Sequence, residues 1–420
     1  MGLLRITGHT QLSGTVPISG RKNAALKLIA ASVLSDKPVT LHRLPDIGDV
    51  RVMLEILERM GASIHREGES VTIHTENLQT SEIPLDLGRK LRASLVLVGP
   101  LLSRFKNVRF PHPGGCVIGK RSIRPHLDAF AQLGATIDFD GTWYTIHGDI
   151  HGSEVYLKEK TVTGTENLIM AACRADGTTS IWNAAEETHI SNLCELLRNM
   201  GYAIHGDGTS RVTIEGNPHL STNQAEVTVI PDEIEIGTFA IAALVTQGTV
   251  RLENVGKRHD LIPILSKLDD FNARYEYNGE DQSLTMLPSP DLKAADVQTN
   301  PWPGFPPDLQ SPFTVLATQA TGTSLIHDWM YEGRLYFVDL LQKMGANITI
   351  CDPHRALVTG PTTLRRNTSI TPDLRAGAAL VLAALAAEGE SIIEHVELID
   401  RGYVNIDDRL RGLGAQIIRE

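Results

Sequence analysis

The chain has few cysteines, few aromatic residues and no long apolar run. Its four cysteines form no CxxC pair and do not stand at zinc-finger spacing from a histidine, which is typical of a protein from a reducing compartment. The longest apolar stretch, residues 376–387, is far shorter than the roughly 18 residues that cross a bilayer. The first residues lack the basic and apolar segments of a signal peptide. These absences predict a soluble, cytoplasmic protein without a membrane partner.

Positive charge is scarce as well. Lysine and arginine number 39 against 50 acidic residues, which gives a net charge of −11. Nucleic acids and anionic membranes are bound through extended basic surfaces, so this balance argues against both as partners. An anionic ligand would need a local basic cluster. Aromatic residues make up only 5% of the chain, which predicts an aliphatic core, and the length of 420 residues allows about two to four domains.

A short signature recurs six times along the chain. Each copy is an amphipathic run that ends in Leu/Met-Gly-Ala, with one degenerate copy, and is followed by a stretch that alternates as a strand does. The glycine is expected to take the left-handed conformation that ends a helix. The repeated position recurs every 67 to 73 residues, at Gly61, Gly134, Gly201, Asn272, Gly345 and Gly414.

An alanine-rich apolar run precedes every signature. Runs that are apolar on all sides indicate buried helices. They cover residues 23–34, 91–102, 166–175, 235–245, 313–320 and 374–387. Each unit is therefore predicted to contain one buried helix, one amphipathic helix and strands around them. Six units exceed the roughly 250–300 residues of a single core, so we expect two α/β domains of three units each, with a continuous solenoid as the disfavoured alternative.

Two glycine-rich stretches combine positive charge with a reactive or anion-binding group. The sequence ISGRKN at residues 18–23 precedes the first buried helix, where helix amides and Lys22 could bind an anion; a solvated basic pair is the alternative. The sequence PHPGGCVIGKRSIRPH at residues 111–126 predicts a long loop, because proline and glycine exclude regular structure. Cys116 lies in this loop beside Lys120 and Arg121, which favour a reactive thiolate.

The other cysteines carry a different expectation. Cys173, Cys194 and Cys351 are expected to be buried and inert. A zinc site built on Cys116 with the histidines at 112 and 126 would lack a fourth ligand, so it is disfavoured.

Scattered arginines and aspartates form a third group of candidates. Guanidinium groups bind carboxylate and phosphate bidentately, so arginines that converge around a reactive cysteine would suit a substrate carrying both groups. For each residue alone, a surface ion pair is the alternative. The candidates lie in LRAS at 91–94, around Asp308 and Arg334, and in DLR at 373–375 and DRG at 400–402.

Eight motifs between Leu4 and the C-terminus carry a resemblance to a known family. They are SGRKNAAL, LRAS, GGCVIGKR, TVTGTEN, PDEIEIGTF, FPPDLQ, DLRA and IDRGY. With them the chain resembles the enolpyruvyl transferases, and GGC together with KNAAL is similar to the branch that uses UDP-N-acetylglucosamine rather than the shikimate branch. The resemblance implies an inside-out α/β barrel of two domains, each of three βαβαββ units. Residues 1–21 with 230–420 would form one domain and residues 22–229, with the Cys116 loop, the other, and the active site would lie in the cleft between them.

The resemblance also implies a reaction and its residues. Such enzymes move the enolpyruvyl group of phosphoenolpyruvate to the 3-hydroxyl of UDP-N-acetylglucosamine and release phosphate, without a metal or organic cofactor, as the first committed step of peptidoglycan synthesis. The implied catalytic residues are Cys116 as proton donor, Asp308 as base, Lys22 and Arg401. Phosphoenolpyruvate would be bound by Lys22, Asn23, Arg121, Arg334, Arg375 and Arg401. The UDP-sugar would be bound by Asn23, Arg92, Arg121, His126, Lys160, Thr163, Gly164, Asp308 and Met330.

Four positions depart from the family pattern. Arg124 stands where an acid is usual, Glu233 where arginine is common, His189 in place of a glutamate and Leu398 in place of a histidine. These departures motivate an alternative in which the acceptor is a different nucleotide or nucleotide-sugar. A non-catalytic paralogue that only binds nucleotide-sugar is disfavoured, because the implied catalytic residues are all present.

Overall fold

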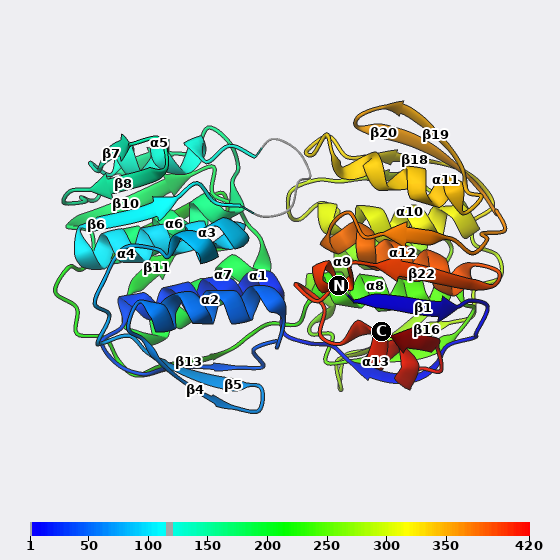
Figure 1. The fold of residues 1–420 in the computed structure, drawn as a ribbon. Coiled ribbons are helices and arrows are strands. Elements are labelled where there is room, and N and C mark those ends of the chain that lie inside the picture. The colour runs from blue at the N-terminus through cyan, green and yellow to red at the C-terminus, as the bar shows by residue number, and fades with distance from the viewer. Residues whose placement is uncertain (1, 115–120) are drawn as a thin grey trace. The chain divides into compact units, whose positions relative to one another are not determined.

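The computed structural model describes residues 2–114 and 121–420. Contacts divide the chain into two compact units. The first unit contains residues 2–19 and Pro231–Glu420, and the second contains residues 20–114 and Arg121–Ile230 (Figure 1). Each unit has its own sheets and its own buried helices.

The first unit contains three four-stranded sheets within its described residues, in the orders β21-β22-β1-β23, β15-β16-β14-β2 and β17-β18-β20-β19. In each sheet one parallel pair adjoins antiparallel pairs, and β1 pairs with both β22 and β23, so the two ends of the chain share a sheet. The strands are β1 (Leu3–Thr7), β2 (Ser13–Pro17), β14 (Thr249–Glu253), β15 (Arg274–Asn278), β16 (Ser283–Leu287), β17 (Val297–Gln298), β18 (Gly322–His327), β19 (Asn347–Asp352), β20 (Arg355–Gly360), β21 (Thr368–Ile370), β22 (Glu390–Glu394) and β23 (Gln416–Arg419).

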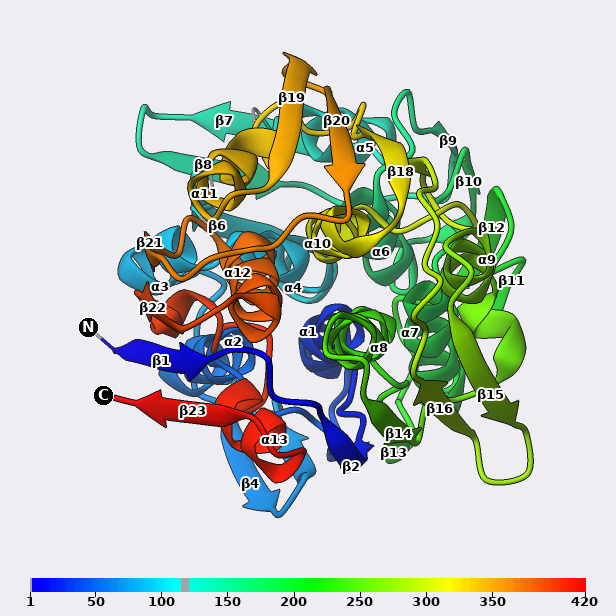
Figure 2. The same ribbon diagram turned by 90° about the vertical axis from the view of Figure 1, so that its right-hand side faces the viewer.

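Three apolar helices form the centre of the first unit. Figure 2 shows α8 (Glu233–Val245), α10 (Gln310–Gln319) and α12 (Leu374–Ala386) side by side with sheets around them, and every residue of α12 is buried. Aspartates cap two of these helices: the buried Asp232 accepts from the first-turn amides of α8, and Asp373 accepts from those of α12. The remaining helical segments are η3 (Arg258–Leu261), α9 (Ile262–Asp270), η4 (Pro307–Leu309), η5 (Arg334–Phe337), α11 (Val338–Lys343), η6 (Val396–Leu398) and α13 (Ile406–Gly412).

The second unit repeats this plan. Its described residues form the sheets β13-β3-β5-β4, β11-β12-β10-β9 and β6-β8-β7. The strands are β3 (Val39–His42), β4 (Ser63–Glu67), β5 (Ser70–His74), β6 (Asn107–Pro111), β7 (Thr136–Phe139), β8 (Trp143–His147), β9 (Glu154–Tyr156), β10 (Gly177–Trp182), β11 (Ala203–His205), β12 (Arg211–Gly216) and β13 (Ala225–Thr228). The helical segments are α1 (Lys22–Ala31), η1 (Ser32–Leu34), α2 (Gly48–Arg59), α3 (Leu85–Lys90), η2 (Arg92–Leu97), α4 (Val98–Phe105), α5 (Arg124–Gln132), α6 (Val162–Ala172) and α7 (Thr188–Asn199).

The structure confirms the predicted buried helices and the predicted helix ends. All six runs are helical, and all six repeated positions have a positive φ, including +59° at Asn272. Two runs contain a 3₁₀ segment: residues 32–34 form η1 after α1 ends, and residues 92–97 form η2 before α4 begins. Pro100 has no backbone N–H, so it removes an α-helical hydrogen bond at this junction.

The sequence predicts that three cysteines are buried, and this prediction is correct for two of them. Cys173 and Cys194 are buried, and burial raises the pKa of both thiols. The prediction is wrong for Cys351, which is exposed. Cys351 lies on the outward face of β19, which it shares with the exposed Asn347 and Thr349.

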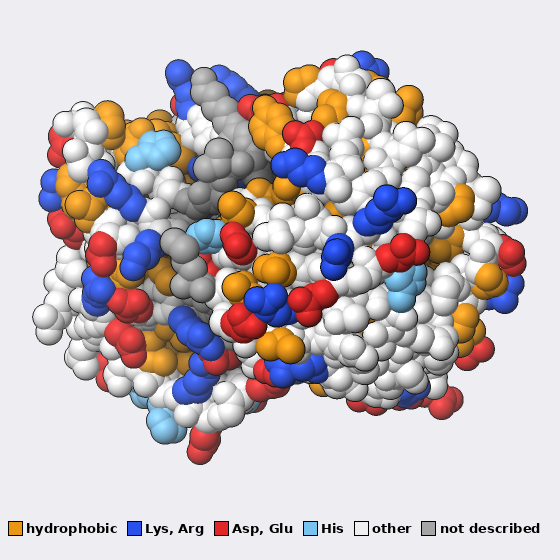
Figure 3. Space-filling view, turned by 45° about the vertical axis from the view of Figure 1, so that its right-hand side comes forward, with side chains coloured by type: hydrophobic (Ala, Val, Ile, Leu, Met, Phe, Trp, Pro, Cys, Tyr) orange, Lys and Arg blue, Asp and Glu red, His pale blue; other side chains and the backbone are white. Residues whose placement is uncertain are grey.

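The surface carries mixed charge. On the face drawn in Figure 3, basic and acidic side chains are interspersed and neither sign forms one broad patch. None of the helices among the described residues is both long and apolar enough to cross a membrane.

Candidate functional site

Asp308 lies between two arginines in the first unit. Its Oδ1 accepts a hydrogen bond from Arg334 Nη2 at 3.1 Å, and its Oδ2 accepts from Arg375 Nε at 3.1 Å, with Arg375 Nη2 at 3.0 Å. Asp308 lies in η4, Arg334 begins η5, and Arg375 is in the first turn of α12. Three segments distant in the sequence therefore place their charged groups at one point.

The two arginines are buried and still charged. Arg334 is 3% exposed and Arg375 4% exposed. Burial alone would lower their pKa values, but the neighbouring acidic groups, of which Asp308 contributes most, together more than offset this, and both pKa values are raised. Nη1 of Arg375 is buried without a hydrogen-bond acceptor in the described part of the chain. A buried donor of this kind favours an additional anionic group beside Asp308.

Asp328 fixes the loop that carries Met330. Its Oδ1 accepts from the backbone amides of Met330 at 3.0 Å and Tyr331 at 3.2 Å, and its Oδ2 lies 3.7 Å from Arg334 Nε. Burial raises the pKa of Asp328, while the charge of Arg334 opposes that shift. Sequence reasoning missed this residue, because nothing in its local sequence links it to an arginine six residues later.

Packing ties the loop of Arg401 to the start of α12. A Cβ on Gly402 would lie 2.7 Å from Leu374 Cδ2, so a larger residue there would displace the Leu374 side chain. Tyr403 stands beneath the same helix end: its ring centroid is 5.4 Å from the Arg375 guanidinium, and its hydroxyl lies 2.9 Å from Thr238 Oγ1. The structure thus brings the segments of Arg375 and Arg401 together.

In the second unit, Lys22 and Asn23 begin α1, as the sequence predicts. Lys22 Nζ lies 3.1 Å from Asp49 Oδ2, with 14% of the lysine side chain and 7% of the aspartate side chain exposed. Asp49 is in the first turn of α2. This carboxylate, which sequence reasoning did not identify, fixes the position of the ammonium group.

Arg92, Arg121 and His126 form a connected group. Arg92 Nη2 donates to the backbone oxygen of Arg121 at 2.8 Å, and His126 Nδ1 lies 3.3 Å from Asn167 Nδ2. Burial, together with the positive charge of Arg92, lowers the pKa of His126 to about 4. The imidazole is therefore neutral at physiological pH.

Lys160, Thr163 and Gly164 lie at the start of α6. Lys160 Nζ donates to Glu186 Oε1 at 2.5 Å, and Thr161 Oγ1 caps the helix by accepting from the Gly164 amide at 3.3 Å. Amides in the first turn of a helix favour anions such as phosphate. The positions of Thr163 and Gly164 in this turn are compatible with such a role.

A buried charged cluster lies deeper in the same unit. Glu166 on α6 is fully buried, with Lys27 Nζ at 3.4 Å and His189 Nε2 at 3.2 Å. Burial raises the pKa of Glu166 to about 7, and it lowers the pKa values of Lys27 and His189. His189, which stands where the family pattern has a glutamate, thus packs against the Glu166 carboxylate inside the unit.

The sequence also predicts a reactive cysteine and disfavours a zinc site. Cys116 lies outside the described residues, so its predicted role stays a prediction. Among the residues that the structure does describe, no group of three or more His, Cys, Asp or Glu side chains could hold a metal ion.

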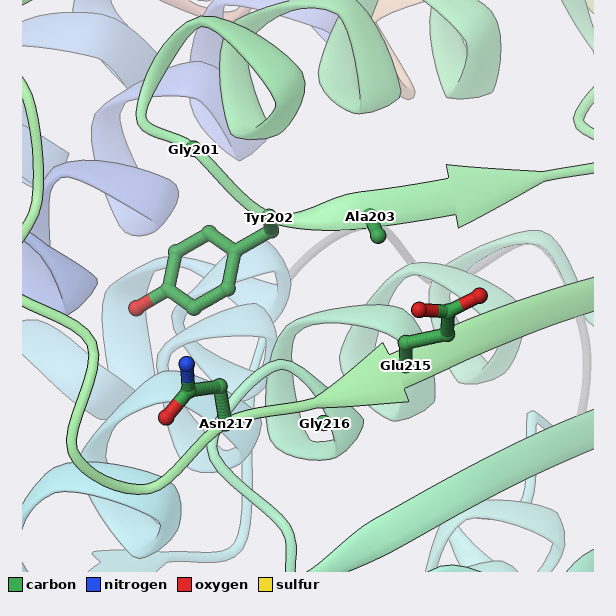
Figure 4. Close-up of a pocket in the computed structure, with 6 residues that line it drawn as sticks. All are labelled: Gly201, Tyr202, Ala203, Glu215, Gly216 and Asn217. Atoms are coloured by element: carbon green, nitrogen blue, oxygen red, sulfur yellow. The ribbon is translucent and has the colours of Figure 1, made fainter.

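A pocket in the second unit contains none of the predicted site residues. Figure 4 shows it where β11 begins and β12 ends. It is lined by Gly201, Tyr202, Ala203, Glu215, Gly216 and Asn217.

Comparisons with known proteins agree over the whole chain. The family model described as EPSP synthase (3-phosphoshikimate 1-carboxyvinyltransferase) matches residues 6–410. The UDP-N-acetylglucosamine 1-carboxyvinyltransferase of Treponema denticola is 43% identical over 424 aligned residues that cover 98% of each chain. The protein of the same name from Treponema pallidum is 41% identical, with 100% of both chains covered.

A solved structure shares the fold. The enolpyruvyl transferase NikO from Streptomyces tendae matches with a TM-score of 0.90 at 25% identity, over 100% of this chain and 98% of its own. This match confirms the predicted fold class. With the family model and the full-length relatives, it follows that the chain belongs to the EPSP synthase family of enolpyruvyl transferases.

Proposed function

We propose that this protein transfers the enolpyruvyl group of phosphoenolpyruvate to the 3-hydroxyl of UDP-N-acetylglucosamine and releases phosphate. The observation that carries the proposal is the 43% identity, over 98% of the chain, to a UDP-N-acetylglucosamine 1-carboxyvinyltransferase. The reaction is an addition followed by an elimination. The acceptor oxygen adds to C2 of phosphoenolpyruvate as C3 gains a proton and becomes a methyl group, and loss of one proton from C3 together with phosphate from C2 restores the double bond.

In the first unit, Arg334 and Arg375 would bind the carboxylate of phosphoenolpyruvate. Both guanidinium groups are buried, and Arg375 keeps a buried donor that Asp308 does not use. Asp308 would accept the proton of the sugar 3-hydroxyl. Its contacts with two arginines favour the carboxylate form that a general base needs.

Lys22, Arg121 and Arg401 would neutralise the phosphate, and Asn23 would contact both substrates. Asp49 supports this role for Lys22 because it fixes the ammonium group at the start of α1. Cys116 would donate the proton to C3. General acid help of this kind is typically worth about 10²–10⁴ in rate, so charge neutralisation and positioning supply the rest.

Arg92, Arg121, His126, Lys160, Thr163, Gly164 and Met330 would bind the UDP-sugar. The alternative of a different nucleotide acceptor is not favoured, since the full-length relatives carry the name of the UDP-N-acetylglucosamine enzyme. Arg124, which motivated that alternative, has an 82% exposed side chain that lies 3.7 Å from Asp128 Oδ1. Its charge is therefore largely solvated.

Phosphate release from phosphoenolpyruvate tests the proposal. The full-length protein is assayed with UDP-N-acetylglucosamine and, separately, with other nucleotides and nucleotide-sugars. We expect turnover with UDP-N-acetylglucosamine, loss of turnover in Cys116→Ala, and normal turnover in the matched control Cys351→Ala, since Cys351 is an exposed thiol on β19. Turnover with another nucleotide but none with UDP-N-acetylglucosamine would overturn the proposal.

A further inference from the structure

Asn167 connects three helical segments of the second unit. Its side-chain Oδ1 accepts from the Gly99 amide at 2.8 Å, and its Nδ2 donates to the Leu95 carbonyl at 2.9 Å. The same Nδ2 lies 3.3 Å from Nδ1 of His126. Asn167 is 1% exposed and belongs to α6, while Gly99 is in α4, Leu95 in η2 and His126 in α5 (Figure 1).

These partners allow only one orientation of the Asn167 amide. The Gly99 N–H is a donor and must face the amide oxygen, whereas the Leu95 carbonyl is an acceptor and must face the NH₂ group. A flipped amide would place donor against donor and acceptor against acceptor, which buried groups do not tolerate. Nδ2 therefore points toward Leu95 and His126.

The orientation determines the tautomer of His126. The NH₂ group has two hydrogens, and one of them is directed to the Leu95 carbonyl. The other is directed to His126 Nδ1, so this ring nitrogen must accept and cannot carry a proton. The burial and the neighbouring Arg92 charge that lower the imidazole pKa to about 4 keep the ring neutral. The single ring proton is then on Nε2.

Close packing holds the amide in this position. A Cβ on Gly99 would lie 2.2 Å from the Asn167 backbone oxygen and 2.9 Å from its Oδ1. The backbones of α4 and α6 thus touch directly, and the side chain of Asn167 has little freedom to move away from His126.

We propose that Asn167 is a positioning residue that holds His126 as its Nε2–H tautomer, so that the ring presents a hydrogen-bond donor to the nucleotide-sugar. This proposal rests on the proposed function, in which His126 binds the acceptor substrate. The ligand group that meets His126 is then a hydrogen-bond acceptor, such as a carbonyl or phosphate oxygen.

Nitrogen NMR of the full-length protein, labelled with ¹⁵N-histidine, tests the tautomer directly. The His126→Gln variant identifies the His126 signals. We expect one pyrrole-type signal for Nε2 and one pyridine-type signal for Nδ1. In Asn167→Asp, the new carboxylate oxygen faces Nδ1, so the expected result is protonation of Nδ1 and a higher imidazole pKa. A wild-type spectrum with the His126 proton on Nδ1 would overturn the proposal, whatever the behaviour of Asn167→Asp.

Steady-state kinetics test the donor. His126→Gln keeps an N–H near the position of Nε2, whereas His126→Glu is of matched size and offers only acceptors when ionised. We expect His126→Glu and Asn167→Asp to raise KM for UDP-N-acetylglucosamine roughly tenfold or more. In these variants KM for phosphoenolpyruvate should change much less. In His126→Gln, KM for UDP-N-acetylglucosamine should also change much less. Equal KM values in the Gln and Glu variants would contradict the donor role while leaving the proposed function intact. Absence of wild-type turnover with UDP-N-acetylglucosamine would instead refute the proposed function. The NMR experiment would still decide which ring nitrogen of His126 carries the proton.

Discussion

Arg375 holds Asp308 through two nitrogen atoms, with Nε at 3.1 Å and Nη2 at 3.0 Å from the same carboxylate oxygen. The other oxygen of Asp308 accepts from Arg334. One carboxylate thus partly neutralises two buried guanidinium groups. A substrate carboxylate that binds these arginines must share them with Asp308, which links the proposed carboxylate-binding residues to the proposed base.

Replacement of Asp308 by asparagine separates its chemical role from its structural one. We expect kcat to fall about 10²- to 10⁴-fold, the usual contribution of a general base. Substrate affinity should fall less, because the arginines no longer have Asp308 as a competitor for phosphoenolpyruvate. The free energy of unfolding should fall by about 1–3 kcal/mol, since two buried cations lose one carboxylate partner that they share. Rates and denaturant melts measure the two effects, and unchanged kcat would exclude Asp308 as the base.

Replacement of Arg375 by lysine tests carboxylate binding. Lysine keeps the charge but cannot contact Asp308 and a second carboxylate through a planar fork. We expect KM for phosphoenolpyruvate to rise at least tenfold, the effect of losing a hydrogen bond to a charged group, with little change for the UDP-sugar. Arg274→Lys is the matched control, because this arginine forms an exposed pair with Asp291 in the same unit. Equal changes in both KM values would argue for a general structural effect.

The low pKa of His126 makes stability depend on pH. The imidazole titrates near 6.5 in an unfolded chain but at about 4 in the folded protein. Between these values the unfolded state binds more protons, so stability that is present above pH 6.5 is lost as the pH falls toward 4. The full effect of this group is about 3 kcal/mol. Denaturant melts between pH 7 and 4 should show a shallower loss in His126→Gln than in the wild type, and parallel curves would contradict the assignment.

The repeat made the helices predictable but not their partners. Apolar runs and cap glycines are local signals, so the sequence located all six buried helices and the left-handed residue at Asn272. The partners of the predicted site residues are distant in the sequence: Arg375 stands 67 positions after Asp308, and Asn167 stands 41 positions after His126. Such pairs depend on which helix ends meet, and no single stretch encodes that. The exposure of Cys351 likewise depends on which face of β19 packs against the unit, and composition does not encode that.

The buried cluster around Glu166 predicts a strong coupling with Lys27. Replacing one member alone leaves a buried polar or charged group without its partner, which typically costs about 3–5 kcal/mol, whereas replacing both often costs much less. We therefore expect Glu166→Gln to be strongly destabilising, because Lys27 loses a carboxylate at 3.4 Å. The double variant with Lys27→Met should recover part of that loss. A double-mutant cycle from denaturant melts measures the coupling, and strictly additive effects would contradict it.

The close approach of α4 and α6 gives a packing prediction with a built-in control. Gly99→Ala places a Cβ 2.2 Å from the Asn167 backbone oxygen, so the helices must separate. Overpacking of this kind costs about 1–3 kcal/mol, and the displaced Asn167 should also raise KM for the UDP-sugar. Gly412 is helical as well, but a Cβ there meets no atom within 4 Å, so Gly412→Ala should be neutral or stabilising by up to about 1 kcal/mol. Similar melting curves for the two variants would show that the contact between Gly99 and Asn167 does not constrain the helices. A destabilised Gly99→Ala with a normal KM for the UDP-sugar would show that helix packing here does not control the position of His126.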